Sequence, residues 1–144
     1  MNILAQYADV IVAPLGFAFM WTLVCFITAG LGGWRKLAGR FRAAEEPEGE
    51  IFSMQSGRFR FMNYNSVLKI IPANRGLYLS VFFLFRPFHP PLLVPWEAIQ
   101  NVRWKTVLFF KYVSFDIVYP ERLLSVSLSR RVAESSRWQA EKPL

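Results

Sequence analysis

The sequence predicts an N-terminal transmembrane α-helix followed by a mainly-β domain, an antiparallel sheet or partly open barrel of about seven strands with a C-terminal helix. Two observations carry this prediction. An uncharged run of 22 residues stands near the N-terminus, and short apolar runs separated by turn residues fill most of the remainder. The chain has 144 residues, 53% of them apolar and 17% aromatic. Besides a membrane span, it has room for one compact domain of roughly 100 residues.

The uncharged run extends from Val10 to Leu31 and has the length of a membrane span. As a helix rising about 1.5 Å per residue it reaches about 33 Å, close to the thickness of a hydrocarbon core. A cleaved signal peptide would need a basic start, and residues 1–9 contain no Lys or Arg. We therefore expect a short extracytoplasmic N-terminus (1–9) and a transmembrane helix (10–31), with Pro14 near its start.

Four basic residues follow the span closely and set its expected orientation: Arg35, Lys36, Arg40 and Arg42. The positive-inside bias places them in the cytoplasm and the N-terminus outside, which in a bacterial cell means the inner membrane. Residues 32–43 form a predicted amphipathic helix, and we expect Trp34 and the four basic side chains to contact the membrane surface. A topology signal alone is the alternative. Residues 44–50 are acidic and form a predicted linker.

Composition narrows the chemistry that the chain could perform. One His and one Cys cannot build a Cys/His zinc site or a disulfide, and no phosphate-cradling glycine loop or nucleophile elbow occurs. We therefore expect no cofactor, no metal and no enzymatic activity. More than half of the formal net charge of +7 lies beside the span, which favours the membrane over nucleic acid as the partner. Ala29 and Gly33, four residues apart, could bring two helices together in a homodimer.

From Ile51 onward, short runs rich in β-branched and aromatic residues alternate with turn residues. They predict strands over residues 51–55, 58–62, 67–71, 77–85, 92–94, 107–119 and 123–128. A closing helix is expected over residues 129–140, with Ser129 as its cap. The β domain is thus predicted to span residues 51–140, with residues 141–144 as a tail.

The predicted strand over residues 77–85 is apolar on both faces. Since a strand with one wet face alternates apolar and polar residues, its second face must be covered by the closing helix, the linker, a partner or the bilayer. We expect Phe82 and Leu84 to contact that partner. Phe88 lies in the proline-rich loop that follows, which could serve as a recognition tip or a wedge that touches the membrane.

Two arginines alternate with two phenylalanines at the start of the domain, so Arg58 and Arg60 are expected to share one sheet face. With Lys69 and Arg75 they could form a basic patch for phosphate or carboxylate groups, including anionic lipid head groups. Ordinary solvated strand positions are the alternative.

The order of these segments carries a resemblance. Residues 77–85 (GLYLSVFFLF with its leading Gly76), the segment Val94-Pro95-Trp96-Glu97-Ala98-Ile99 and a closing helix are similar to pleckstrin-homology-like (PH-like) domains, in particular the GRAM and bacterial PH groups. The whole chain resembles small bacterial inner-membrane proteins with one anchor. The resemblance implies a domain that binds lipid head groups, peptides or proteins. The sequence thus predicts a membrane-anchored, non-catalytic PH-like binding module; an accessory subunit of a larger inner-membrane complex is the alternative.

Overall fold

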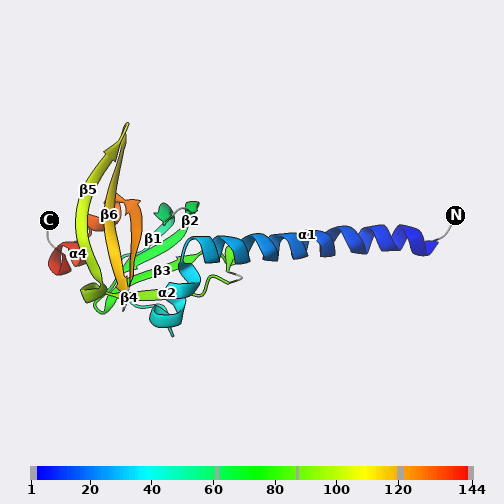
Figure 1. The fold of residues 1–144 in the computed structure, drawn as a ribbon, viewed down its shortest axis with the longest axis horizontal. Helices are drawn as coiled ribbons and strands as arrows, with labels where there is room; N and C mark the ends of the chain where they lie inside the picture. Colours follow the sequence, from blue (N-terminus) through cyan, green and yellow to red (C-terminus); the bar gives the residue numbers. More distant parts are fainter. Residues whose placement is uncertain (1–2, 61, 87, 120–121, 143–144) are drawn as a thin grey trace.

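A computed structural model describes residues 3–60, 62–86, 88–119 and 122–142. A long helix projects from one end of a β domain, and the C-terminal helices lie at the other end (Figure 1). The helices are α1 (Ile3–Leu31), α2 (Trp34–Phe41), α3 (Arg130–Ala133) and α4 (Ser136–Glu141), with 3-10 turns at Phe83–Phe85 and Trp96–Ala98. The strands are β1 (Phe52–Phe59), β2 (Met62–Pro72), β3 (Gly76–Val81), β4 (Leu92–Pro95), β5 (Ile99–Val107), β6 (Phe110–Tyr119) and β7 (Arg122–Ser129).

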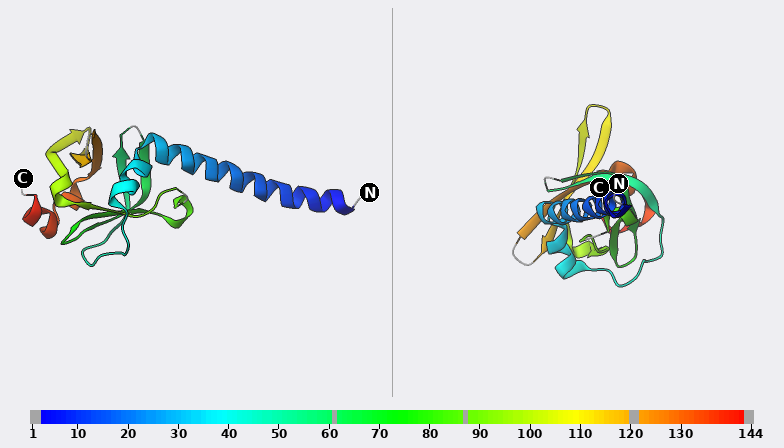
Figure 2. Two further views of the ribbon diagram at one scale, coloured as in Figure 1. Left: turned by 60° about the horizontal axis from the view of Figure 1, so that its bottom comes forward. Right: turned by 90° about the vertical axis from the view of Figure 1, so that its right-hand side faces the viewer.

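The strands of the described residues form one antiparallel sheet in the order β4-β3-β2-β1-β7-β6-β5. The sheet curls into a half-barrel, and the β5–β6 hairpin extends steeply away from the direction of α1 (Figures 1 and 2). The predicted class, a helix plus a curled sheet of seven strands with C-terminal helices, is confirmed at this level. Two predicted runs, 51–55 and 58–62, are largely one strand, β1, whereas β5 was not predicted.

The core fills the inside of the curl and joins the sheet to the helices at both ends of the domain. Its largest fully buried side chains come from helices as well as strands: Trp34, Trp138, Phe59 and Phe115. Trp96 is also buried, and its indole Nε1 donates to the Ala73 carbonyl over 2.8 Å. Each large apolar side chain removed from water in this way contributes about 1.5–3 kcal/mol.

Helix α1 is longer than the predicted span and begins at Ile3, so Pro14 lies inside it rather than near its start. The part from Ala5 to Leu31 is long and apolar enough to cross a membrane. Up to Met20 its described side chains are exposed, whereas Cys25 and Ala29 are buried against the β domain. One face of the last third of α1 is therefore part of the domain's packing, while Leu23, Ile27 and Leu31 on that stretch remain exposed.

Helix α2 is amphipathic as predicted, but its apolar face points into the domain. Trp34 and Leu37 are fully buried and Phe41 nearly so, while the four basic side chains are exposed on the opposite face. The expectation that Trp34 contacts the membrane surface is therefore wrong: its indole fills the core and donates to the Pro90 carbonyl over 2.8 Å. An apolar helix face packs equally well against a bilayer or a protein core, and in this structure it packs against the core.

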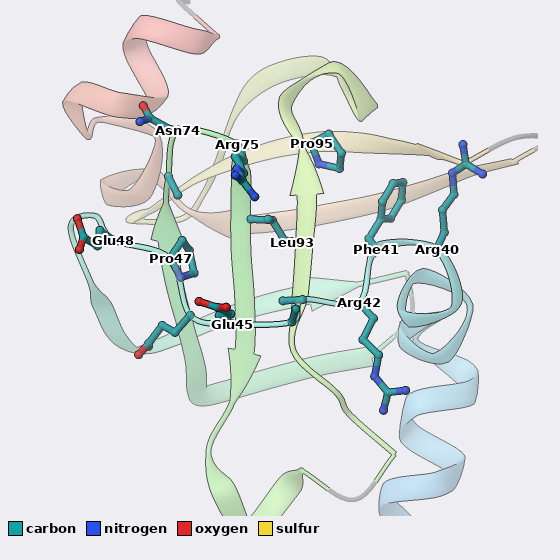
Figure 3. A pocket seen from close by; sticks show the side chains of 14 residues that line it. Arg40, Phe41, Arg42, Glu45, Pro47, Glu48, Asn74, Arg75, Leu93 and Pro95 are labelled. Atoms are coloured by element: carbon teal, nitrogen blue, oxygen red, sulfur yellow. The ribbon is translucent and has the colours of Figure 1, made fainter.

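The acidic linker covers the second face of β3. It leaves α2, forms an isolated bridge between Arg42 and Leu92 of β4, and crosses the strands toward β2 (Figure 3). There Glu46 forms an ion pair with Lys69, and Gly49 lies against Ile71. Tyr78 and Ser80 lie on the second face of β3, whose cover the sequence did not identify, and both are buried. Of the covers considered for this strand, the linker is the one present in the fold.

Two predicted elements differ from the expectation, one in its end and one in its continuity. Strand β3 stops at Val81, and Phe83–Phe85 form a 3-10 turn, so Phe82 and Leu84 belong to a loop and not to a strand face. The predicted closing helix is split into α3 and α4. Its cap is Ser135, whose hydroxyl accepts from the Trp138 amide, whereas Ser129 makes no capping hydrogen bond. The split lets Trp138 turn into the core, where it packs against Trp96 and Phe115.

Candidate functional site

The candidate site is the end of the β domain from which α1 projects. Gly32 lies close to Met62 and Tyr64 of β2, and Gly33 lies close to Leu124 of β7. The beginnings of β2 and β7 therefore lie at the point where α1 leaves the domain. We call this end, with residues 82–86 and 88–89, the helix-exit surface.

Residues 82–86 and 88–89, which follow β3, lie alongside α1. The indole Nε1 of Trp21 donates to the Leu84 carbonyl over 2.7 Å, and the Trp21 ring lies 5.0 Å from the Phe85 ring. Further along the helix, the rings of Phe26 and Phe88 meet edge to face at 5.0 Å. These contacts bring together residues about 60 positions apart in the sequence, and they fix the loop against two successive levels of the helix.

A buried polar pair supports this contact from inside the domain. The Tyr64 hydroxyl and His89 Nε2 lie 3.0 Å apart, and both rings pack against Trp34. Burial raises the pKa of Tyr64 well above its ordinary value of 10.0, because its anion would lose hydration. His89 lies at the end of the loop and is 2% exposed. Its contacts with Tyr64 and Trp34 therefore hold this end of the loop in the domain, while α1 holds the other end.

Four exposed arginines are neighbours in the sequence of residues that contact α1 or the turn after it. Arg35 follows α1 directly, and three others stand within two residues of side chains that contact the helix region: Arg60, Arg86 and Arg122. All four are exposed. The guanidinium of Arg35 folds back along α1 to lie 4.0 Å from the Phe26 ring centroid and against Gly30, where a Cβ would clash with it. The sequence pointed to Arg35 and Arg60. Arg86 and Arg122 are added because the fold brings their neighbours Phe85 and Leu124 to α1 and to the turn after it.

The predicted basic patch is dispersed. Arg58 lines a hollow of about 240 Å³ on the outer sheet face, with Asn63, Lys105, Tyr112 and Ser127. Arg60 is not part of this hollow, because β1 ends at Phe59 and Arg60 adopts a left-handed backbone (φ 59°). The strand alternation that predicted a shared face therefore stops before Arg60.

The other two predicted residues lie under the linker. Lys69 pairs with Glu46, and Arg75 lines a hollow of about 650 Å³ between the linker and strands β3 and β4 (Figure 3). Arg40 and Arg42 line the same hollow, but so do Glu45, Glu46 and Glu48. Positive and negative side chains thus balance there, and the hollow has no net preference for an anion. Lys36 is exposed on α2.

No cluster of three or more His, Cys, Asp or Glu side chains able to hold a metal occurs in the described parts of the chain. Asp116 instead accepts hydrogen bonds from Asn101 and Ser125 on the outer sheet face. Comparison of the chain with protein-family models, curated proteins and solved structures returned no match. The helix-exit surface is therefore interpreted from its own geometry.

Proposed function

We propose that this chain is a membrane-anchored, non-catalytic binding module whose β domain rests on the bilayer and binds anionic lipid head groups at the helix-exit surface. The observation that carries the proposal is the continuity of α1 with the core: the apolar helix does not end in a flexible tether but runs directly into buried packing at Ala29 and Trp34. A domain built in this way stands at the membrane whenever the helix is inserted.

The packing of α1 favours an anchor over the two other uses of an apolar N-terminal helix. A core helix of a soluble protein would be covered, and the described side chains up to Met20 are exposed. A signal sequence would be removed, but cleavage after α1 would take Cys25 and Ala29 out of the domain's packing. An inserted α1 satisfies both observations, because lipid covers the exposed part and the domain covers the rest.

Anionic head groups suit the charges around α1. Arg35, Arg60, Arg86 and Arg122 are exposed and stand within two residues of side chains that contact α1 or the turn after it, and each contributes about 1 kcal/mol near an anionic surface. Guanidinium groups bind phosphate with two parallel hydrogen bonds, which favours them over lysines for this role. By the positive-inside bias, we further propose that the domain is cytoplasmic and the membrane is the inner membrane.

We also propose that the β domain belongs to the PH-like class that the sequence resembles. The curled sheet of seven strands and the C-terminal helices that close one end of it support this assignment. Such domains bind ligands without catalysis, which agrees with the non-catalytic role proposed for this chain.

The test reconstitutes the full chain in bilayer discs of phosphatidylcholine alone or mixed with phosphatidylglycerol. Thermal unfolding of the domain is then followed for three proteins: the unchanged chain, the variant Arg35→Gln/Arg86→Gln/Arg122→Gln, and the matched control Arg75→Gln/Lys111→Gln/Arg131→Gln. All six substituted side chains are exposed, so the two variants lose equal charge without opening the core.

We expect phosphatidylglycerol to raise the unfolding midpoint of the unchanged chain and of the control, and to leave the helix-exit variant at its neutral-lipid value. High salt should reduce the difference, because exposed charges are screened. Equal stabilisation of all three proteins would refute head-group binding at this surface. Extraction of the unchanged chain from membranes by alkaline carbonate would refute the anchor itself.

A second function, an accessory subunit of a larger membrane complex, is favoured by the tip of the β5–β6 hairpin. Leu108 and Phe109 are 84% and 95% exposed, and Phe110 beside them is 62% exposed. Apolar tips of this kind are typical of contacts with another protein. Native pull-down of the unchanged chain and of Phe109→Ser distinguishes this function: a partner that Phe109→Ser releases would support it.

A further inference from the structure

We propose that the segment of residues 82–85, at the start of the loop after β3, is inserted into the leaflet on the domain side, so that Phe82, Phe83 and Leu84 lie among lipid acyl chains beside α1. This inference rests on the proposed membrane span. It goes beyond it by assigning part of the β domain, and not only the helix, to the interior of the bilayer. The partner of this apolar surface is therefore lipid.

The loop is fixed to α1 well before the helix ends. Trp21 donates to the Leu84 carbonyl and packs on Phe85, and it precedes Leu31 by ten residues. At about 1.5 Å per residue, the Leu84 end of the loop lies about 15 Å along the helix from Leu31. Phe88, packed on Phe26, lies at an intermediate level. The loop thus extends along α1 toward the N-terminal part that lipid must cover.

Two charged residues locate the hydrocarbon boundaries on α1 independently. With Asp9 at the outer boundary, a hydrocarbon core of about 30 Å ends about 20 residues later, near Ala29. The guanidinium of Arg35 folds back to the level of Phe26 and Gly30, where it would meet lipid phosphates. Both place the inner boundary near residues 26–30. Trp21 and the Leu84 carbonyl then lie about 8–14 Å inside it.

The loop's backbone is suited to such a position. Peptide groups in lipid need internal partners, because no water is present to hydrogen-bond them. The amides of Phe82, Phe85, Arg86 and His89 donate to the carbonyls of Val67, Phe82, Phe83 and Arg86, respectively. The Leu84 carbonyl accepts from the indole of Trp21. The 3-10 turn and the tryptophan on α1 together satisfy much of the polar backbone that insertion would bury.

The side chains of the loop also suit insertion, because most of them are apolar. Phe82, Phe83 and Leu84 are 49%, 60% and 51% exposed, which is unusual for three consecutive large apolar residues. Arg86 is the one charged residue in the sequence from Phe82 to Phe88. It lines a hollow with Phe82 and Phe83 and with Ser66 and Lys69 of β2. From there a long side chain can extend to the head groups while the apolar side chains beside it stay in the acyl region.

The test measures the depth of the loop in vesicles of equal parts phosphatidylcholine and phosphatidylglycerol. On a Cys25→Ala background, a fluorescent maleimide is attached to the full chain at Phe83→Cys, at Phe17→Cys in the middle of α1, or at Ser136→Cys in the C-terminal helix. Each labelled protein is reconstituted with lipids that carry a nitroxide quencher on the head group, high on the acyl chain or at its end. Ser136 is the control for an exposed position at the opposite end of the domain.

We expect the label at position 83 to lose most fluorescence with the quencher high on the acyl chain, and the label at position 136 to lose none. Strongest quenching of position 83 by the head-group nitroxide, or no quenching there, would overturn the inserted loop while quenching of position 17 leaves the span intact. If position 17 also escaped all three quenchers, the span itself would be absent. The two proposals therefore fail separately.

Discussion

Replacement of Trp34 by alanine is the sharpest test of whether α2 belongs to the β domain. The side chain is fully buried, packs at 5.0 Å on the Phe59 ring and at 5.7 Å on the Tyr64 ring, and donates a hydrogen bond to Pro90. Truncating a buried aromatic residue costs about 3–5 kcal/mol. Against a total stability of about 5–15 kcal/mol for a domain of this size, Trp34→Ala should leave a marginally folded protein.

Two further substitutions separate the contributions of packing and hydrogen bonding. Trp34→Phe keeps a ring in the core and removes the indole donor, so it should cost less than Trp34→Ala. The lost bond alone is worth about 1 kcal/mol. Trp104→Ala is the matched control, because this tryptophan is 39% exposed and lies on β5 with the Arg130 guanidinium 4.3 Å from its ring. It should cost less than either Trp34 variant.

The assay is urea unfolding of the full chain in a mild detergent, followed by brief proteolysis that digests the unfolded fraction. Its midpoint reports the population of the unfolded domain when opening is fast relative to cleavage. If Trp34→Ala unfolded at the same urea concentration as Trp104→Ala, α2 would not be part of the core. The apolar face of α2 would then be free to lie on the membrane.

Three other predictions follow from the packing. Gly33→Ala should destabilise the chain by about 1–2 kcal/mol, because φ is +76° and the new Cβ would lie 2.5 Å from Leu124 Cδ1. Gly39→Ala should stabilise the chain, because Gly39 lies in α2 with open space around it. The urea unfolding midpoints of the two variants test this difference. Because Tyr64 resists ionisation in the folded domain but not in the unfolded chain, the free energy of unfolding should fall above about pH 10, and Tyr64→Phe should lose this component of a pH titration of stability. Leu108→Gly should raise the thermal midpoint slightly and leave the circular dichroism unchanged, since this exposed turn residue has φ 57°; a lowered midpoint would contradict the reasoning.

The fold class was predictable because local patterns determine it. The uncharged run, the short β-rich runs and the turn residues predicted an apolar helix and about seven strands, and the structure has both. Strand β5 was not predicted because it buries few side chains. Along Ile99–Val107, charged and polar residues interrupt the apolar ones, and Trp104 on this strand is exposed. Its pairing with β6 depends on a tight turn at two apolar residues, Leu108 and Phe109, which carry no turn signal.

The candidate site was less predictable, because it depends on contacts between distant residues. Periodicity placed Trp34 on an apolar helix face, but the same face suits a bilayer or a core. Nothing local links Trp21 to Leu84, which lie 63 positions apart, or Gly33 to Leu124, which comes two residues after Arg122. Likewise, Ala29 and Gly33 show the spacing of a helix-pairing motif, yet both are buried by the domain, so that pair is unavailable to a second helix.

The connection between α1 and α2 also has a mechanical consequence. It consists of two glycines held by backbone hydrogen bonds from Gly32 to Thr28, from Gly33 to Gly30 and from Leu37 to Gly33, and it is packed on both sides by the β domain. A spanning helix tilts when its apolar length and the bilayer thickness differ. With so short and enclosed a connection, a tilt of the helix in the proposed membrane span would turn the domain with it. The β5–β6 hairpin, which extends farthest from the line of α1 (Figure 1), would then move the most, so a change in membrane thickness would displace its apolar tip.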